Sequence, residues 1–391
     1  MSISLDRDLA FLDSVRLIAD EVSAPNSDAV DRGARFPTES IEALRGERAL
    51  SAGLPTELGG GGVSFEAIAG GCFELGRRCG SSAMVFAMHQ IKVLTLARHL
   101  DGAPWFSEYL ARVADEQRLV ASVTTEIGTG GDMGRSIAAV TPGQNGTCTF
   151  EKKAPVVSYG AHADDLFVTL RRDPDSEASD QVIALAMRGQ AELEPAGTWD
   201  PLGMRGTCSP GFVIRAVIAP EQVLPAPFSA VMSESMVPIT HILWSHLWLG
   251  IATDAFDRAR AFVRASAKQK PGETPPTAVR LSHLMSELSM LRSEVGSGLE
   301  AFVKASEEPS REWLSTMQAA IRFNNLKIAA SDQAPRVCQS AMGVCGIVGF
   351  KNDTPYSVGR HLRDTMSASL MIANERIHQT NASLLLIAKD V

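Results

Sequence analysis

The spacing of hydrophobic and polar positions divides the chain into three parts. From residue 4 to about 118, apolar side chains recur at helical spacing, which predicts amphipathic helices. From about 119 to 228, the apolar residues fall in short β-branched and aromatic runs bounded by Gly, Pro and Asp, which predicts strands. The clearest of these predicted strands cover residues 147–151, 166–170, 182–187 and 212–218.

Helical spacing returns from about residue 237. It predicts four long amphipathic helices, which pack most simply as an antiparallel bundle. These helices cover residues 239–263, 278–305, 311–343 and 364–387. We therefore expect a mostly α protein of the α+β class, with an N-terminal helical domain at 1–118, a small middle β-barrel or β-sandwich domain at 119–228 and a C-terminal four-helix bundle at 229–391.

Composition and charge narrow the class of protein. The chain has 391 residues, 45% of them hydrophobic and 21% charged, so it can bury large cores without disulfides. A net charge of −8 without a long block of like charge argues against nucleic-acid binding. The six cysteines are scattered and contain no Cys-x-x-Cys, so we interpret them as reduced thiols, and no histidine or cysteine cluster predicts a metal. Because we find neither a membrane-length apolar run nor a signal-peptide pattern, we expect a cytoplasmic protein.

The segment 119–132 carries the strongest chemical signal. Its β-rich run ends at Thr124, Thr125 and Glu126 and opens into a glycine loop closed by Asp132. Glycines let a planar ring or a phosphate approach the backbone, and the threonine hydroxyls can donate or accept hydrogen bonds. Taken alone, the loop has a simpler interpretation as an ordinary turn after a strand.

Four further motifs stand in a fixed order along the chain. They are Pro-Thr-Glu-Leu-Gly-Gly-Gly-Gly at 55–62, Gly-Met-Arg-Gly-Thr at 203–207, Gly-Ile-Val-Gly-Phe at 346–350 and Leu-Arg-Asp at 362–364. Together with the Thr-Thr-Glu loop and the domain order, they resemble the acyl-CoA dehydrogenase superfamily of flavoproteins over nearly the whole chain. The resemblance implies a flavin oxidoreductase of fatty acid metabolism that dehydrogenates an acyl thioester, on CoA or a carrier protein, between its α and β carbons. Its cofactor would be FAD, with FMN as an alternative, and its electron acceptor electron-transfer flavoprotein or oxygen.

The resemblance also assigns cofactor-binding residues in the middle domain. In the family, the residues that match Thr124, Thr125 and Glu126 lie against the flavin ring, and the residue that matches Gly130 belongs to the same loop. A hydroxyl residue that matches Ser158, by its spacing to the following Ala-Asp pair, lies near flavin N5. The alternative for Ser158 is a strand-end hydroxyl that caps its own turn.

A further part of the implied cofactor site involves a second copy of the chain. In the family's tetramer, the loop that matches Gly346 and Gly349 lies against the adenosine end of FAD bound mainly by a neighbouring subunit. We also expect a homotetramer or homodimer because the segment 239–251, with Trp244 and Trp248, has more apolar surface than one bundle core needs.

The catalytic base departs from the family pattern. In many members a glutamate follows the Arg-Asp pair at a fixed interval, and that position here is Ile372; in another subgroup the base stands at about Thr240. The nearest carboxylate is Glu375, which we expect to remove the substrate α-proton from an apolar face of the helix 364–387. The alternative is that Glu375 pairs with Arg376 or faces water.

The residues expected to contact the FAD pyrophosphate also differ from the family pattern. The family usually carries Arg-x-x-Phe-Gly after the first bundle helix, whereas this chain has Arg264, Lys268 and Lys270 there. These cations either contact phosphate or are solvated charges at a helix end. A protein without the base can instead act as a flavin-dependent monooxygenase or oxidase that uses reduced flavin and oxygen, as other members of the superfamily do. A non-catalytic binding role is the third hypothesis.

Overall fold

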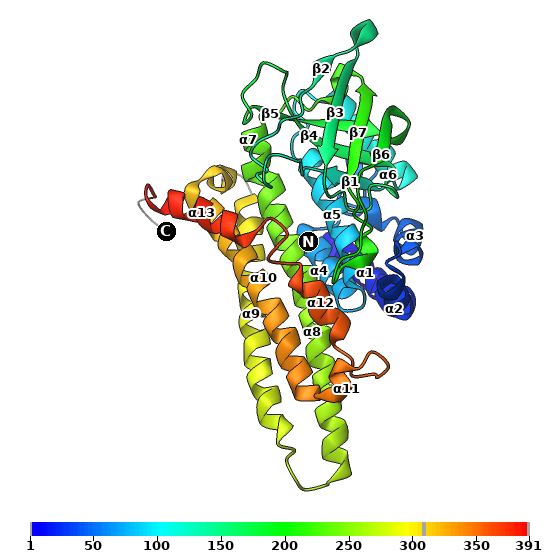
Figure 1. Cartoon of the computed structure of the whole chain (residues 1–391), viewed down its shortest axis with the longest axis vertical. Helices are drawn as coiled ribbons and strands as arrows, with labels where there is room; N and C mark the ends of the chain where they lie inside the picture. Colours follow the sequence, from blue (N-terminus) through cyan, green and yellow to red (C-terminus); the bar gives the residue numbers. More distant parts are fainter. Residues whose placement is uncertain (1, 307–309, 389–391) are drawn as a thin grey trace.

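The computed structural model describes residues 2–306 and 310–388 and has three regions along the chain (Figure 1). The N-terminal region is helical, as its apolar spacing predicts. Its helices are α1 (Ser2–Ile18), α2 (Ala24–Gly33), α3 (Thr38–Gly46), α4 (Phe65–Gly76), α5 (Gly80–Ala97) and α6 (Pro104–Glu116). Proline stands at the first position of α6, where a missing N–H costs nothing, and a serine side chain caps α4.

The middle region forms two small sheets. In the first, β1 pairs in parallel with β4, and β4 pairs antiparallel with β5; the second is antiparallel in the order β2-β3-β7-β6. The strands are β1 (Val120–Val123), β2 (Thr141–Pro142), β3 (Cys148–Ala154), β4 (Asp165–Arg171), β5 (Gln181–Met187), β6 (Ala191–Pro195) and β7 (Phe212–Ile218). The four strands predicted from the sequence correspond to β3, β4, β5 and β7. The remaining three are shorter or less apolar.

The C-terminal region contains three long helices and several short ones. They are α7 (Phe228–Val231), α8 (Val237–Gln269), α9 (Thr277–Ser306), α10 (Met317–Cys345), α11 (Ile347–Phe350), α12 (Gly359–Met366) and α13 (Asn374–Leu385). The predicted single helix at 364–387 is wrong, because turns at 367–373 separate α12 from α13. The predicted fold class is confirmed, with helical regions on either side of a small β region. The exact domain boundaries stay predictions.

The helix α8 forms the centre of the molecule. It packs against α4, α5, α9 and α10, and nearly every residue from 238 to 256 is buried. Glycines permit the closest crossing: a Cβ at Gly76 would overlap the carbonyl oxygen of Leu247. Trp244 and Trp248 are only 5% and 0% exposed, so their supposed surplus of apolar surface is covered within one chain and does not indicate a partner.

A buried contact joins the C-terminal region to the middle region. Asp364 is buried, and its Oδ1 accepts a hydrogen bond of 2.7 Å from the backbone N–H of Met204. Burial raises the pKa of the Asp364 carboxyl to about 6. A Cβ at Gly203 would overlap the backbone carbonyl of Arg363, which explains why the Gly-Met-Arg-Gly motif starts with glycine. Two motifs that are far apart in the sequence therefore form one junction.

Candidate functional site

The Glu126 carboxylate holds the two ends of the glycine loop together. Glu126 is buried, and its oxygens accept hydrogen bonds from the Ser136 hydroxyl at 2.8 Å and from the backbone N–H groups of Ile137 at 3.0 Å and Ala138 at 2.6 Å. Lys152 Nζ lies 3.5 Å away, and burial lowers its pKa to about 8 against the opposing effect of Glu126. The side chain of Glu126 is thus occupied within the protein, so its part at the predicted site is to shape the loop.

The threonine segment and the segment that carries Ser158 lie side by side. The Thr125 hydroxyl donates a hydrogen bond of 2.7 Å to the backbone carbonyl of Val156. The backbone N–H of Ile127 donates one of 2.9 Å to the backbone carbonyl of Lys153. Thr124 and Thr125 are each half-buried at the end of β1. The structure therefore places the threonine segment beside residues 153–156, just before Ser158, and the flavin contacts of these three residues stay a prediction.

Ser158 belongs to a chain of hydroxyls. Its Oγ accepts a hydrogen bond of 3.1 Å from Ser209, and Ser209 shares a bond of 2.8 Å with Thr207. No hydrogen bond from Ser158 to its own turn occurs among the described residues, which disfavours the capping interpretation. Thr207 ends the Gly-Met-Arg-Gly-Thr motif, so the motif could have located this third segment, whereas Ser209 carried no signal.

Glu375 does not lie on the apolar helix face that the sequence predicts. It is exposed in the first turn of α13, and the turns at 367–373 separate it from the Arg-Asp pair. It makes no ion pair with Arg376 among the described residues. Ile372, at the family's base position, has φ of +49°, a strained conformation for a β-branched residue. Among the described residues, no carboxylate forms a hydrogen bond with Ile372, and the catalytic role of Glu375 stays a prediction.

A buried lysine contacts Ile372 and acts electrostatically on His241, the neighbour of Thr240. Lys327 Nζ donates to the carbonyl of Ile372 at 2.8 Å and to Asn374 Oδ1 at 2.7 Å, and burial lowers its pKa to about 7. His241, next to Thr240 on α8, is also buried; desolvation and the charge of Lys327 lower its pKa to about 3. Sequence reasoning missed Lys327, although a cation one turn after the apolar Phe323 was a visible signal.

The loop of Gly346 and Gly349 lies away from the threonine segment within one chain. It follows the end of α10, whereas the sheets lie at the opposite end of the molecule (Figure 1). Gly346 has φ of +63°, and Gly349 is buried against Cys345. The adjacent Ile347 and Phe350 are 72% and 68% exposed. The predicted cofactor residues therefore form two separate groups, and a single chain does not unite them.

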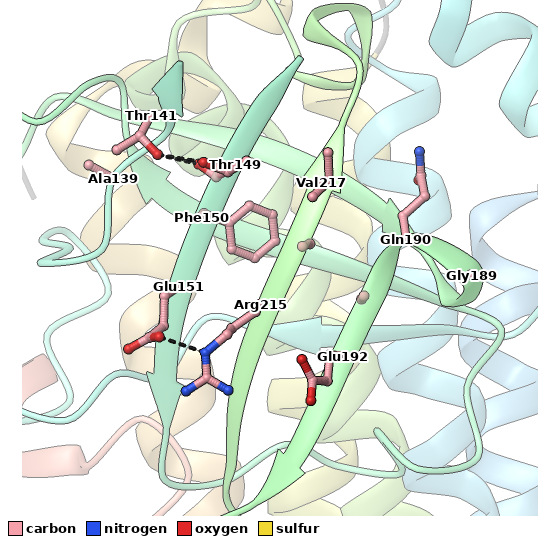
Figure 2. Close-up of a pocket in the computed structure, with 12 residues that line it drawn as sticks. Ala139, Thr141, Thr149, Phe150, Glu151, Gly189, Gln190, Glu192, Arg215 and Val217 are labelled. Atoms are coloured by element: carbon pink, nitrogen blue, oxygen red, sulfur yellow. Dashed lines mark hydrogen bonds and ion pairs between the residues drawn. The ribbon is translucent and has the colours of Figure 1, made fainter. Parts of the chain in front are cut away.

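Two surface depressions lie outside the threonine segment. The larger, about 800 Å³, lies on the four-stranded sheet, where Arg215 pairs with Glu151 at 2.8 Å (Figure 2). Arg215 also pairs with Glu194 at 2.7 Å. The arginine of this depression is already paired with two carboxylates, so the depression offers no unpaired cation to an anionic ligand. The smaller, about 400 Å³, lies between α10 and α12 and includes Ser331 and Asp332. Both of these residues hydrogen-bond to Asn374, so this groove adjoins the Lys327 cluster.

Residues 2–306 and 310–388, the described part of the chain, contain neither a metal cluster nor a membrane-spanning helix. Within those ranges, no group of three or more His, Cys, Asp or Glu side chains is placed to hold a metal ion. The same described helices include none with the length and apolar character needed to cross a membrane.

Comparisons with known proteins give a consistent result. The family model for the acyl-CoA dehydrogenase N-terminal domain matches residues 6–130, and the model for the C-terminal domain matches residues 238–378. Cyclohex-1-ene-1-carbonyl-CoA dehydrogenase of Syntrophus aciditrophicus is 25% identical over 388 residues, covering 96% of this chain and 89% of its own. Dibenzothiophene monooxygenase of Mycolicibacterium goodii is 25% identical over 301 residues, covering 74% and 69%. The structure of FMN-bound TdsC from Paenibacillus sp. A11-2 superposes with a TM-score of 0.80 at 20% identity, covering 96% and 97%.

Proposed function

The chain belongs to the acyl-CoA dehydrogenase family of flavin oxidoreductases, and on that premise we propose that it oxygenates a small organic substrate with reduced flavin and molecular oxygen. The observation that carries the proposal is the site around Ile372. The family's proton-abstracting glutamate is replaced there by an isoleucine whose carbonyl is held by a buried lysine. Relatives of this chain include both dehydrogenases and monooxygenases, so the choice between the two reactions depends on the residues of the site.

Dehydrogenation of a thioester requires a catalytic base shielded from water, and this site does not provide one. A base has to reach the α-carbon from a position shielded from water, because only then can it take a weakly acidic proton. Glu375 is exposed to solvent, and the Ile372 carbonyl is held by Lys327, which also donates to Asn374; Asn374 in turn donates to Asp332. This set supplies hydrogen-bond donors from a lysine with a pKa of about 7 and from an amide, and its carboxylate, Asp332, already accepts a hydrogen bond from Asn374. It suits the stabilisation of developing negative charge, which oxygen chemistry requires.

The residues of the threonine segment fit a flavin nucleotide, FAD or FMN. Thr124, Thr125 and Ser158 present hydroxyl and peptide groups on adjoining segments, and the exposed Gly130 leaves the backbone open to a planar or anionic ligand. Bound there in reduced form, a flavin supplies the two electrons with which oxygen is activated. The hydroxyls would orient it, and Lys327 would set the charge beside the substrate. FMN is named with the TdsC structure.

Dehydrogenation of an acyl thioester is the second candidate. It is favoured by the dehydrogenase of Syntrophus aciditrophicus, because that relative aligns over 96% of this chain. In that case Glu375 would be the base, after a rearrangement of the turns at 367–373 that turns its carboxylate inward. Electron-transfer flavoprotein would then be the acceptor.

We propose further that the chain forms a homo-oligomer, a tetramer or a dimer, through its C-terminal region. Large apolar side chains are exposed there, including Leu370 at 76%, Leu386 at 87% and Met290 at 58%, together with Ile347 and Phe350. So many large apolar side chains left in water on one region favour a partner surface over part of it. A neighbouring copy could bring its Gly346 loop to the cofactor. A monomeric mass by light scattering at micromolar concentration would overturn this proposal.

The proposed reaction is tested by tracing oxygen into product. Reduced FMN is generated by a separate flavin reductase and NADH, and a panel of aromatic thioethers, amines and phenols is incubated with the protein under ¹⁸O₂. We expect one ¹⁸O atom in the product of at least one substrate class, with no product when either the protein or the reductase is left out. Reduction of flavin by an acyl-CoA without any reductase would favour the second candidate instead.

A further inference from the structure

The structure places a guanidinium over the glycine loop. Arg376, in the first turn of α13, lies against Gly130 and Gly131: a Cβ at Gly130 would be 2.8 Å from its Nη2, and one at Gly131 would be 3.7 Å from its Nε. Both glycines have positive φ, +60° and +84°, a conformation that other L residues rarely adopt. The cation therefore rests on backbone that only glycine leaves bare.

The Arg376 guanidinium has no anionic partner within the described part of the chain. Glu375 is its sequence neighbour and Asp132 closes the loop, yet neither comes within ion-pair distance of it. Asp132 instead accepts a hydrogen bond of 2.9 Å from the N–H of Gly134. An arginine presents five N–H donors in a fixed fork that matches a phosphate or carboxylate. A half-buried arginine over a glycine loop therefore lacks an anion of that shape.

We propose that Arg376 binds the phosphate next to the ribityl chain of the flavin nucleotide, the group that FMN and FAD share. This inference rests on the proposed function, because the flavin has to lie along the threonine segment. The N-terminus of α13, a helix of 12 residues, adds partial positive charge beside the same loop. Arg376 thus takes over the task of the arginine that the family carries after its first bundle helix. Arg264 and Lys268 in that region are exposed near the far end of α8 (Figure 1).

The test compares flavins with and without phosphate. Riboflavin, FMN and FAD are titrated by fluorescence quenching against the wild type and against Arg376→Gln, Arg376→Lys and Arg292→Gln. The last variant removes the same charge from an exposed position on α9 and serves as the matched control. We expect Arg376→Gln to lose about 10- to 100-fold in affinity for FMN, and for FAD if FAD binds, with riboflavin affinity unchanged. Arg376→Lys should lose less, and Arg292→Gln nothing.

Each other outcome has a definite meaning. If Arg376→Gln weakens riboflavin as much as FMN, or leaves FMN affinity unchanged, then Arg376 does not bind the phosphate and the inference is overturned. If the wild type binds none of the three flavins, the proposed function fails first, which separates the two failures. Thermal unfolding of each variant excludes loss of the fold, since Arg376 makes no side-chain bond within the described residues whose loss would destabilise the protein.

Discussion

Replacement of Lys327 by methionine tests the cluster at Ile372 through the stability of the fold. Methionine has a similar length and no charge, so the change removes the two hydrogen bonds to Ile372 and Asn374 without opening a large cavity. The Ile372 carbonyl then has no side-chain donor, which costs about 1–3 kcal/mol, whereas Asn374 keeps a bond of 3.2 Å from the Ser331 hydroxyl and its own bond of 2.9 Å to Asp332. We therefore expect a lower free energy of unfolding at pH 9, where Lys327 is uncharged in the folded protein.

The pH dependence is the sharper part of this prediction. Burial lowers the pKa of Lys327 from 10.5 to about 7, so above about pH 7 the native state releases the proton while the unfolded state retains it. The unfolded state then binds more protons, and the stability of the wild type rises with pH by at most about 1.4 kcal/mol per unit until about pH 10.5. Below about pH 7 this contribution is constant. The variant lacks it, so its deficit should grow by about 1–2 kcal/mol between pH 7.5 and pH 9.

The assay is equilibrium urea unfolding at pH 7.5, 8.2 and 9.0, read by tryptophan fluorescence. Lys304→Met, an exposed lysine near the end of α9, is the control and should follow the wild type at each pH. A deficit of Lys327→Met that stays constant or shrinks as pH rises would refute the reasoning, because it would mean that Lys327 keeps an ordinary pKa in the folded protein.

Three further predictions use other contacts of the structure. Gly203→Ala should lower the thermal midpoint strongly or prevent soluble expression, because its Cβ would overlap a backbone carbonyl, whereas Gly343→Ala in the open interior of α10 should be neutral or stabilising by up to about 1 kcal/mol. Asp364→Ala should cost about 2–4 kcal/mol in urea unfolding, since it leaves a buried N–H without its acceptor. Glu375→Gln should leave ¹⁸O incorporation within about twofold of the wild type; a loss of about 10²-fold or more would restore Glu375 as the base.

The sequence predicted the long helices and the main strands because their apolar spacing records burial along a single element. The same periodicity failed at residues 367–373. The helix ends at Met366, and Ile372 in the following turns has positive φ and a carbonyl held by Lys327, 45 residues earlier in the chain. A contact between residues so far apart in the sequence does not affect the spacing of apolar residues within one element. For the same reason, Trp244 and Trp248 predicted a partner surface although α4 and other helices of the same chain cover α8.

The candidate site was predicted in part. Thr124, Thr125 and Ser158 were identified by motifs, and the structure places them on adjoining segments. Lys327 and Arg376 were not identified as site residues, because each acts on a segment that is distant in the sequence. An ionisable residue on the apolar face of a helix was the available sign for Lys327. Nothing in the sequence around Arg376 indicated that its side chain would lie on Gly130.

The central claim, that this family member uses reduced flavin and oxygen rather than an acyl thioester as reductant, is tested most directly by an anaerobic half-reaction. The protein is loaded with FMN or FAD, oxygen is removed, and acyl-CoA thioesters of short, medium, long and cyclic chains are added while the visible absorbance of the bound flavin is followed. We predict that no thioester bleaches the flavin, whereas NADH with a flavin reductase does. Bleaching of the wild-type protein by any acyl-CoA, slowed in Glu375→Gln, would contradict the claim and establish a dehydrogenase.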